Sequence, residues 1–151
     1  MVLLRLQPGQ ISKYWDVVRY TLAVSVPPIT KLTDRYFVKC LEALLAGKMQ
    51  AWVFLEKVVS TKINAMVVTE IIGDPISGTK SLLVYAGTTF EVDPNLKEWK
   101  GATIKLMRFG KANNCVTMTS YVNNPRLMEI YKKLGICSEY FFVEIDLNKP
   151  L

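Results

Sequence analysis

Apolar residues recur along this chain at two different spacings, and each change of spacing marks the boundary of a predicted element. Helical spacing, with an apolar residue at every third or fourth position, covers four stretches: residues 11–22, 37–45, 94–112 and 125–134. Apolar runs or alternations typical of strands cover six more: residues 3–6, 50–56, 63–72, 81–90, 116–122 and 137–147. The predicted order is therefore β-α-α-β-β-β-α-β-α-β.

The links between these elements indicate how the strands pair. Short connections join the three strands between Gln50 and Phe90, which is typical of an antiparallel meander. The strand–helix–strand passage from Ser81 to Val122 predicts a parallel pair joined by a crossover helix. We therefore expect an α/β (α+β) fold with a mixed, mainly antiparallel central sheet and helices on both faces. No internal repeat or linker interrupts residues 1–151, so a single domain is expected.

Composition narrows the chemistry that is open to the protein. Half of the 151 residues are hydrophobic, yet no apolar run approaches the roughly 20 residues of a membrane span. The N-terminus lacks the features of a secretory signal, so a cytoplasmic protein is expected. Three distant cysteines argue against a zinc site or a disulfide framework. Because histidine is absent, Ser-His and Cys-His catalysis and histidine ligands are excluded, and we expect no metal.

The basic residues are concentrated in one segment. Between Asn95 and Gly135 the chain carries eight basic and two acidic residues, which accounts for the whole net charge of +6. A basic face of this kind suggests an anionic partner: nucleic acid, an acidic membrane surface or a phosphorylated cofactor. The alternative is a plain solvated helix face. Nucleic-acid binding is disfavoured because the chain shows no RNA- or DNA-binding motif.

A short sequence motif between Val122 and Gly135 resembles one found in a known protein family. Its sequence is V-N-N-P-R-L-M-E-I-Y-K-K-L-G, in which Tyr131 stands seven residues after Asn124. This spacing and the predicted element order resemble the Gcn5-related N-acetyltransferase (GNAT) superfamily, where a phrase like N-x-x-A-x-x-x-Y-x-x-x-G-F follows the fifth strand. The phrase departs at its final position, where Ile136 replaces the aromatic residue.

The resemblance implies that acetyl-CoA is the co-substrate. Its pantetheine arm would pair with the free backbone of the strand 81–90, at Tyr85, Ala86 and Gly87, and would lie beside Asn124. Asn124 equally fits a plain helix N-cap. The pyrophosphate would lie at the N-terminus of the next helix, where backbone N–H groups and the helix dipole favour anions. The residues implied there are Lys97, Lys100, Gly101 and Ala102.

The phosphate-binding loop of the superfamily, Q/R-x-x-G-x-G/A, is degenerate in this chain. Lys97 falls at the first position, Lys100 replaces the first glycine, and Ala102 keeps the small second position. A side chain at the first glycine position obstructs the approach of phosphate to the backbone. The chain thus resembles a divergent member of the superfamily.

Three residues are candidates for acid and base catalysis. Tyr131 would be the general acid that protonates the departing thiolate of CoA, or it is a core tyrosine between Leu127 and Leu134. Glu91 and Glu70 are the candidates for the general base, directly or through water. Both glutamates also fit plain solvent charges at the ends of strands.

The expected function is transfer of an acetyl group from acetyl-CoA to an unidentified amine acceptor. The amine would attack directly, without a covalent enzyme intermediate, and proximity would provide most of the acceleration. The alternative is an inactive GNAT-fold protein that binds a protein partner or an anionic ligand. No membrane partner is expected, and a homodimer remains open.

Overall fold

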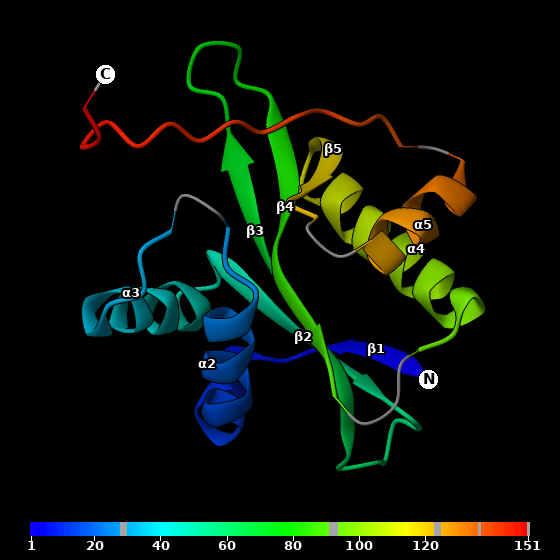
Figure 1. Cartoon of the computed structure of the whole chain (residues 1–151). Coiled ribbons are helices and arrows are strands. Elements are labelled where there is room, and N and C mark those ends of the chain that lie inside the picture. The colour runs from blue at the N-terminus through cyan, green and yellow to red at the C-terminus, as the bar shows by residue number, and fades with distance from the viewer. Residues whose placement is uncertain (28–29, 91–93, 123–124, 136, 151) are drawn as a thin grey trace.

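The computed structural model describes residues 1–27, 30–90, 94–122, 125–135 and 137–150, and these contain a five-stranded sheet (Figure 1). The strands lie in the order β1-β2-β3-β4-β5. Their bounds are Val2–Arg5, Met49–Leu55, Ile63–Gly73, Lys80–Thr89 and Cys115–Ser120. The first three pairs are antiparallel, whereas β4 and β5 are parallel. The predicted meander and the predicted parallel pair are therefore both confirmed.

Helices cover both faces of this sheet, as the sequence predicts (Figure 1). On one face, α1 (Pro8–Ile11) and the 3₁₀ turn η1 (Ser12–Tyr14) lead into α2 (Trp15–Val24), and α3 (Asp34–Leu45) follows. On the other face lie α4 (Leu96–Ala112), which is the crossover helix, and α5 (Pro125–Leu134). Among the described residues, no helix combines the length and the apolar character that crossing a bilayer requires.

The sheet separates two apolar cores. Val53 and Met66 point toward α2 and α3, where they pack with residues such as Leu22. Phe54 and Val67 point to the opposite face and pack under α4. Successive strand residues face opposite sides of a sheet, so the central strand β2, buried along its whole length, contributes to both cores.

A buried chain of hydrogen bonds links the two central strands. The indole Nε1–H of Trp52 donates to the Thr69 hydroxyl at 2.9 Å, and that hydroxyl donates to Gln50 Oε1, also at 2.9 Å. All three side chains are almost completely buried. Because each polar group has a partner, these polar residues can lie in the core without a large desolvation penalty.

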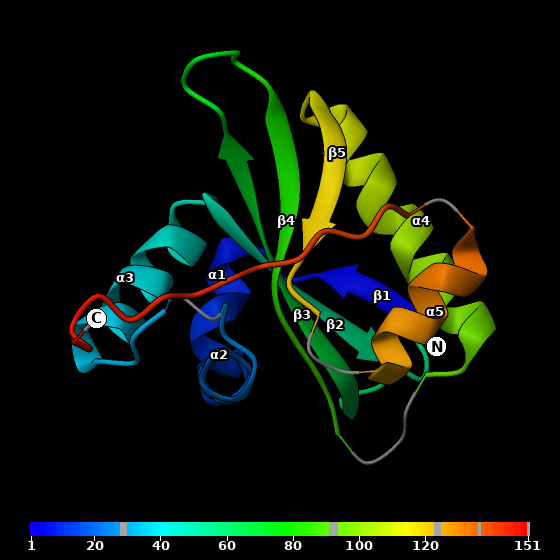
Figure 2. The ribbon, with the colours of Figure 1, turned by 45° about the horizontal axis from the view of Figure 1, so that its top comes forward.

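The last predicted strand, Cys137–Leu147, is not formed. Residues 137–150 run as an exposed segment without strand pairing, and their trace passes across β4 in both views (Figures 1 and 2). The apolar alternation that predicted a strand is present in the sequence. A strand also has to pair with a partner strand, and this segment pairs with neither β1 nor β5, the two outer strands of the described sheet.

Candidate functional site

The parallel strands β4 and β5 separate half-way along β4. They pair from Lys80 and Cys115 to Val84 and Ser120, where β5 ends. Beyond Val84, β4 continues to Thr89 with β3 as its neighbour on one side only (Figure 2). The backbone of residues 85–89 therefore presents an edge that is not part of a ladder with β5.

A β-bulge lies at the point of separation. Val84 pairs with Thr69 and Ala86 pairs with the next residue, Val68, so that Tyr85 is an extra residue in β4. As a result, Val84 packs in the α4 core whereas Ala86 is buried beneath α2, although residues two apart on a regular strand share a face. A bulge bends its strand and increases the local twist, which turns the end of β4 away from β5.

A cleft of about 450 Å³ occupies the resulting opening. Its walls come from the C-terminal end of α2, the part of β4 after the bulge, the end of β5, and the facing sides of α4 and α5. Phe54 and Val67 of the α4 core line its floor. No described lining residue carries a formal charge, and four of them are tyrosines. The cleft can therefore accept an uncharged extended group and offers hydroxyls as proton donors.

Polar groups from the end of α2 reach the free edge of β4. The Gly87 N–H donates a hydrogen bond to the Ser25 hydroxyl at 3.1 Å. The hydroxyls of Tyr85 and Thr30 lie 3.5 Å apart. The segment around the end of α2 thus fixes one wall of the cleft. Sequence analysis missed Ser25, because its role depends on a contact with a residue 62 positions away.

Tyr131 extends from α5 into the cleft, beside the end of β5. Burial raises the pKa of its phenol, and a hydrogen bond with the Ser120 hydroxyl partly opposes that shift. A phenol with a raised pKa stays protonated at neutral pH. Tyr131 can therefore act as a proton donor to a group bound between β4 and β5.

Glu70, a candidate for the general base, lies outside the cleft. It pairs in the ladder between Met49 and Leu83, and its side chain faces α3. Burial raises the pKa of the Cys40 thiol in α3, and the charge of Glu70 adds to that shift. Glu70 is not among the residues that line the cleft. Partial burial raises the pKa of its own carboxyl group.

We expect Glu70→Gln to increase the free energy of unfolding at pH 7 by more than it does at pH 4. A carboxyl group with a raised folded-state pKa stabilises the fold fully below its unfolded pKa of about 4.3, and this contribution is lost as pH rises through the folded pKa. Urea unfolding at both pH values measures the difference. Glu56→Gln, at an exposed residue after β2, is the control. A larger gain at pH 4 would contradict the expected direction.

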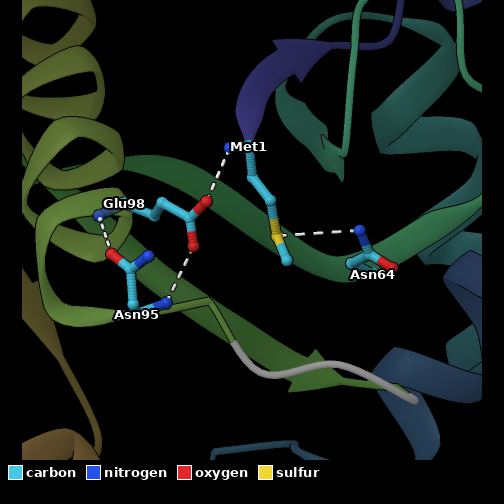
Figure 3. A network of polar contacts seen from close by, with 4 residues as sticks. All are labelled: Met1, Asn64, Asn95 and Glu98. Atoms are coloured by element: carbon cyan, nitrogen blue, oxygen red, sulfur yellow. Dashed lines mark hydrogen bonds and ion pairs between the residues drawn. The ribbon is translucent and has the colours of Figure 1, made fainter.

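The N-terminus of α4 is capped by the side chains of Asn95 and Glu98 (Figure 3). Asn95 Oδ1 accepts from the Glu98 N–H at 3.0 Å, and Glu98 Oε2 accepts from the Asn95 N–H at 2.8 Å, which forms a capping box. Glu98 Oε1 also pairs with the α-amino group of Met1 at 2.7 Å. These bonds lower the pKa of Glu98, the one with Met1 contributing most. A carboxylate therefore already interacts with the positive end of the helix dipole.

The predicted phosphate-site residues lie around this turn. Lys97 and Gly101 line a second cavity of about 570 Å³, between α4 and β1. Ala102 is buried and borders both cavities, whereas Lys100 is exposed and borders neither of them. The N–H groups of Leu96 and Lys97 have no hydrogen-bond partner among the described residues.

The structure brings part of the predicted site together. Tyr85, Ala86, Gly87 and Ala102 line the same cleft as Tyr131. Two predicted residues, Glu91 and Asn124, lie outside the described residues. Within the described chain, no group of three or more cysteine or acidic side chains is arranged to hold a metal ion.

No protein-family model matches the chain, and no curated protein matches it in sequence. Solved structures do match it over nearly their whole length. A predicted acetyltransferase from Clostridium acetobutylicum, solved with acetyl-CoA, is 16% identical with a TM-score of 0.70, covering 97% of this chain and 96% of that one. Glucosamine-6-phosphate N-acetyltransferase from Arabidopsis thaliana is 15% identical with a TM-score of 0.65, covering 97% and 98%.

Ribosomal-protein-alanine N-acetyltransferase from Brucella melitensis biovar Abortus 2308 is 9% identical, with a TM-score of 0.65 and coverage of 97% and 100%. These proteins share with this chain the mixed sheet and the arrangement of helices around it. The chain therefore has the fold of the Gcn5-related N-acetyltransferases.

Proposed function

We propose that this chain is an N-acyltransferase that moves an acetyl group from acetyl-CoA to an amine acceptor. The observation that carries the proposal is the opening between β4 and β5, which has a free backbone edge on one side and Tyr131 on the other. The acetyltransferase names of the structural neighbours support the same reaction class.

The cleft fits the pantetheine arm of acetyl-CoA. This arm is an extended, uncharged chain with two amide groups, and such a chain can pair with a free strand edge in the way that an added peptide strand does. The edge of residues 85–89 is not paired with β5, and the described side chains that line the cleft are uncharged. The Gly87 N–H would have to exchange its bond to Ser25 for a bond to the ligand. That N–H could then polarise the thioester carbonyl.

The proposed step forms one bond and breaks another. The acceptor nitrogen attacks the thioester carbonyl carbon, a C–N bond forms, and the C–S bond breaks. The Tyr131 phenol gives its proton to the departing thiolate. The proton released by the acceptor nitrogen passes to water, and the phenolate recovers a proton from the solvent. The products are the N-acetylated amine and CoA.

The N-terminus of α4 favours a second candidate, an inactive protein of the same fold that binds a partner. Asn95 and Glu98 already occupy N–H groups that an incoming pyrophosphate would use, and the Glu98 carboxylate would repel it. Lys97 and Lys100 carry compensating positive charge, and the Leu96 and Lys97 N–H groups have no partner within the part of the chain that the structure describes. The active enzyme requires that attraction of the pyrophosphate by the lysines outweighs its repulsion by Glu98. The inactive binding protein is expected if repulsion is the stronger effect.

Thermal unfolding with acetyl-CoA is the deciding measurement. A ligand at 100 times its dissociation constant adds about 2.7 kcal/mol of stability, which raises the Tm of a chain of this size by roughly 5–10 °C. We expect such a rise with acetyl-CoA and a much smaller one with adenosine 3′,5′-bisphosphate, which lacks the arm. No shift with millimolar acetyl-CoA would support the inactive protein, and equal shifts with both compounds would support a site for anions alone.

A further inference from the structure

The exposed face of α4 is rich in cations along its whole length. The helix lies at the outside of the molecule in both views (Figures 1 and 2), and none of the exposed residues from Leu96 to Ala112 is acidic. Its single acidic residue, Glu98, is partly buried and pairs with the α-amino group of Met1. A helix face that is merely solvated usually interleaves the two signs of charge as i,i+4 pairs. The exposed basic residues are Lys97, Lys100, Lys105, Arg108 and Lys111.

These five cations spread across the face instead of forming a single line. Successive residues of an α-helix are rotated by about 100°, so Lys97 and Arg108 lie near the middle of the exposed face. Lys100 and Lys111 lie on one flank, and Lys105 lies on the other. The distance along the axis from Lys97 to Lys111 is about 21 Å. The helix therefore presents positive charge in its centre and on both flanks, over about four turns.

Strand β1 supports the second flank. Lys105 Nζ donates to the backbone oxygen of Leu3 at 2.7 Å, and the guanidinium of Arg5 lies 5.2 Å from the centroid of the Phe109 ring. Neither contact involves a carboxylate, so both positive charges remain available to an anion. An ammonium group has three donors, which leaves Lys105 with two for a ligand.

The proposed cofactor accounts for only part of this charge. A pyrophosphate at the N-terminus of α4 would lie beside Lys97 and Lys100. Arg108 and Lys111 lie about 16 and 21 Å further along the helix than Lys97, and they line neither of the two cavities. Within the described chain, neither of them forms an ion pair. This part of the face is therefore suited to a longer anion than the cofactor.

The character of the face favours double-stranded DNA among large anions. The apolar side of α4 is buried against the sheet, so the helix cannot insert that side into a lipid surface. The exposed face of α4 contains no aromatic side chain, the type on which single-stranded bases stack and which anchors protein partners. The major groove of A-form RNA is too narrow to be read by side chains, whereas that of B-DNA admits an α-helix.

We propose that the exposed face of α4 binds double-stranded DNA through its phosphates. The middle of the face lies over the major groove, and the cations of the two flanks contact the phosphates of the two strands. The exposed face of α4 carries no asparagine, glutamine or acidic side chain, the types that recognise adenine and cytosine, so binding depends little on sequence. Contacts of this kind need charge and no sequence motif, and they do not depend on acyl transfer.

The first test is the salt dependence of DNA binding. Fluorescence anisotropy of a labelled duplex of mixed sequence measures the Kd. If the five cations of α4 each neutralise one phosphate, the slope of log K against log salt is about −4.5. The affinity should then fall about 10²–10³-fold between roughly 50 and 200 mM salt. Absence of binding at the lower salt, or a slope that corresponds to one phosphate or fewer, would overturn the proposal.

The second test removes charge from the part of the face that the cofactor does not use. The double variant Arg108→Gln, Lys111→Gln should reduce the slope by about two and weaken DNA binding more than about tenfold at the lower salt. The control Lys31→Gln, Arg35→Gln removes the same charge from exposed residues before and within α3, on the other side of the sheet, and should bind DNA like the parent. An equal loss in both variants would show that net charge, and not α4, is responsible.

Two further measurements keep this result separate from folding and from the proposed function. Both double variants should retain the far-UV spectrum of the parent. They should also retain the rise in Tm that acetyl-CoA produces, because none of the four residues lines the cleft. A parent protein that binds DNA through α4 but shows no such rise would contradict the proposed acyl transfer and leave DNA binding intact.

Three other anions test the choice of DNA. Double-stranded RNA, poly-glutamate and vesicles that contain phosphatidylserine are added as competitors, at the same concentration of negative charge as unlabelled duplex DNA. Each should displace the labelled duplex less effectively than the unlabelled DNA does. If one of them competes as well as DNA, α4 binds another class of anion and the proposal is wrong.

Discussion

Replacing Phe54 by alanine is expected to lower the free energy of unfolding by about 3–5 kcal/mol, which is the usual range for removing a buried aromatic side chain. Phe54 is 1% exposed, and its ring packs edge-on against Trp99 at a centroid distance of 5.1 Å. The contact joins the central strand β2 to the crossover helix α4. Urea unfolding of the two proteins measures the loss.

A matched control distinguishes burial from the loss of a large apolar side chain as such. Ile76, in the turn between β3 and β4, is 94% exposed, so Ile76→Ala should change stability by less than about 0.5 kcal/mol. Because Phe54 also lines the cleft floor, its removal enlarges the cleft. A loss as small as that of Ile76→Ala would show that the α4 core does not depend on this ring.

The Tyr131→Phe variant is expected to slow acetyl transfer by roughly 10²–10⁴-fold, the range that general acid catalysis supplies. The phenol lies in the cleft, and its raised pKa keeps it protonated at neutral pH. The affinity for acetyl-CoA should change little, because the substitution removes one oxygen atom and keeps the ring. Steady-state kinetics and the ligand-induced rise in Tm measure the two effects separately.

Tyr121→Phe is the appropriate control, since Tyr121 lines the same cleft but is 40% exposed beyond the end of β5. It should leave the turnover rate unchanged. If transfer is measurable and Tyr131→Phe leaves its rate unchanged, Tyr131 is a packing residue of α5 and the acid must come from another group. If both variants are equally slow, the effect arises from cleft polarity rather than from a positioned proton donor.

Local periodicity explains why most of the elements could be predicted. Strand β3, predicted over residues 63–72, spans Ile63–Gly73, and α4, predicted over 94–112, spans Leu96–Ala112. In both cases a single stretch of chain contains the apolar pattern and its ending signal. The pattern of residues 137–147 is equally clear, yet no strand forms, because pairing depends on an edge that the periodicity of one segment does not describe.

Residues of the candidate site could be predicted only where they are close in sequence or belong to one sequence motif. Tyr131 was found from its spacing, and the structure places it in the cleft. Ser25 was not assigned to a site, because it meets β4 only after folding. The capping box of Asn95 and Glu98 has a signature in the sequence, N-x-x-E, that sequence analysis overlooked beside the degenerate loop.

The extra residue in β4 makes the length of that strand as important as its composition. Deleting Tyr85 would leave Val84 opposite Thr69 and Ala86 opposite Val68, so the pairing with β3 would become regular, and the bend that turns the end of β4 away from β5 would be lost. Deleting a paired residue such as Leu83 would instead move Leu82, now completely buried under α4, to the side of α2 and α3. Insertions and deletions in this strand should therefore be tolerated much less well than point substitutions, and related chains should conserve the number of residues between the turn before β4 and the start of α4.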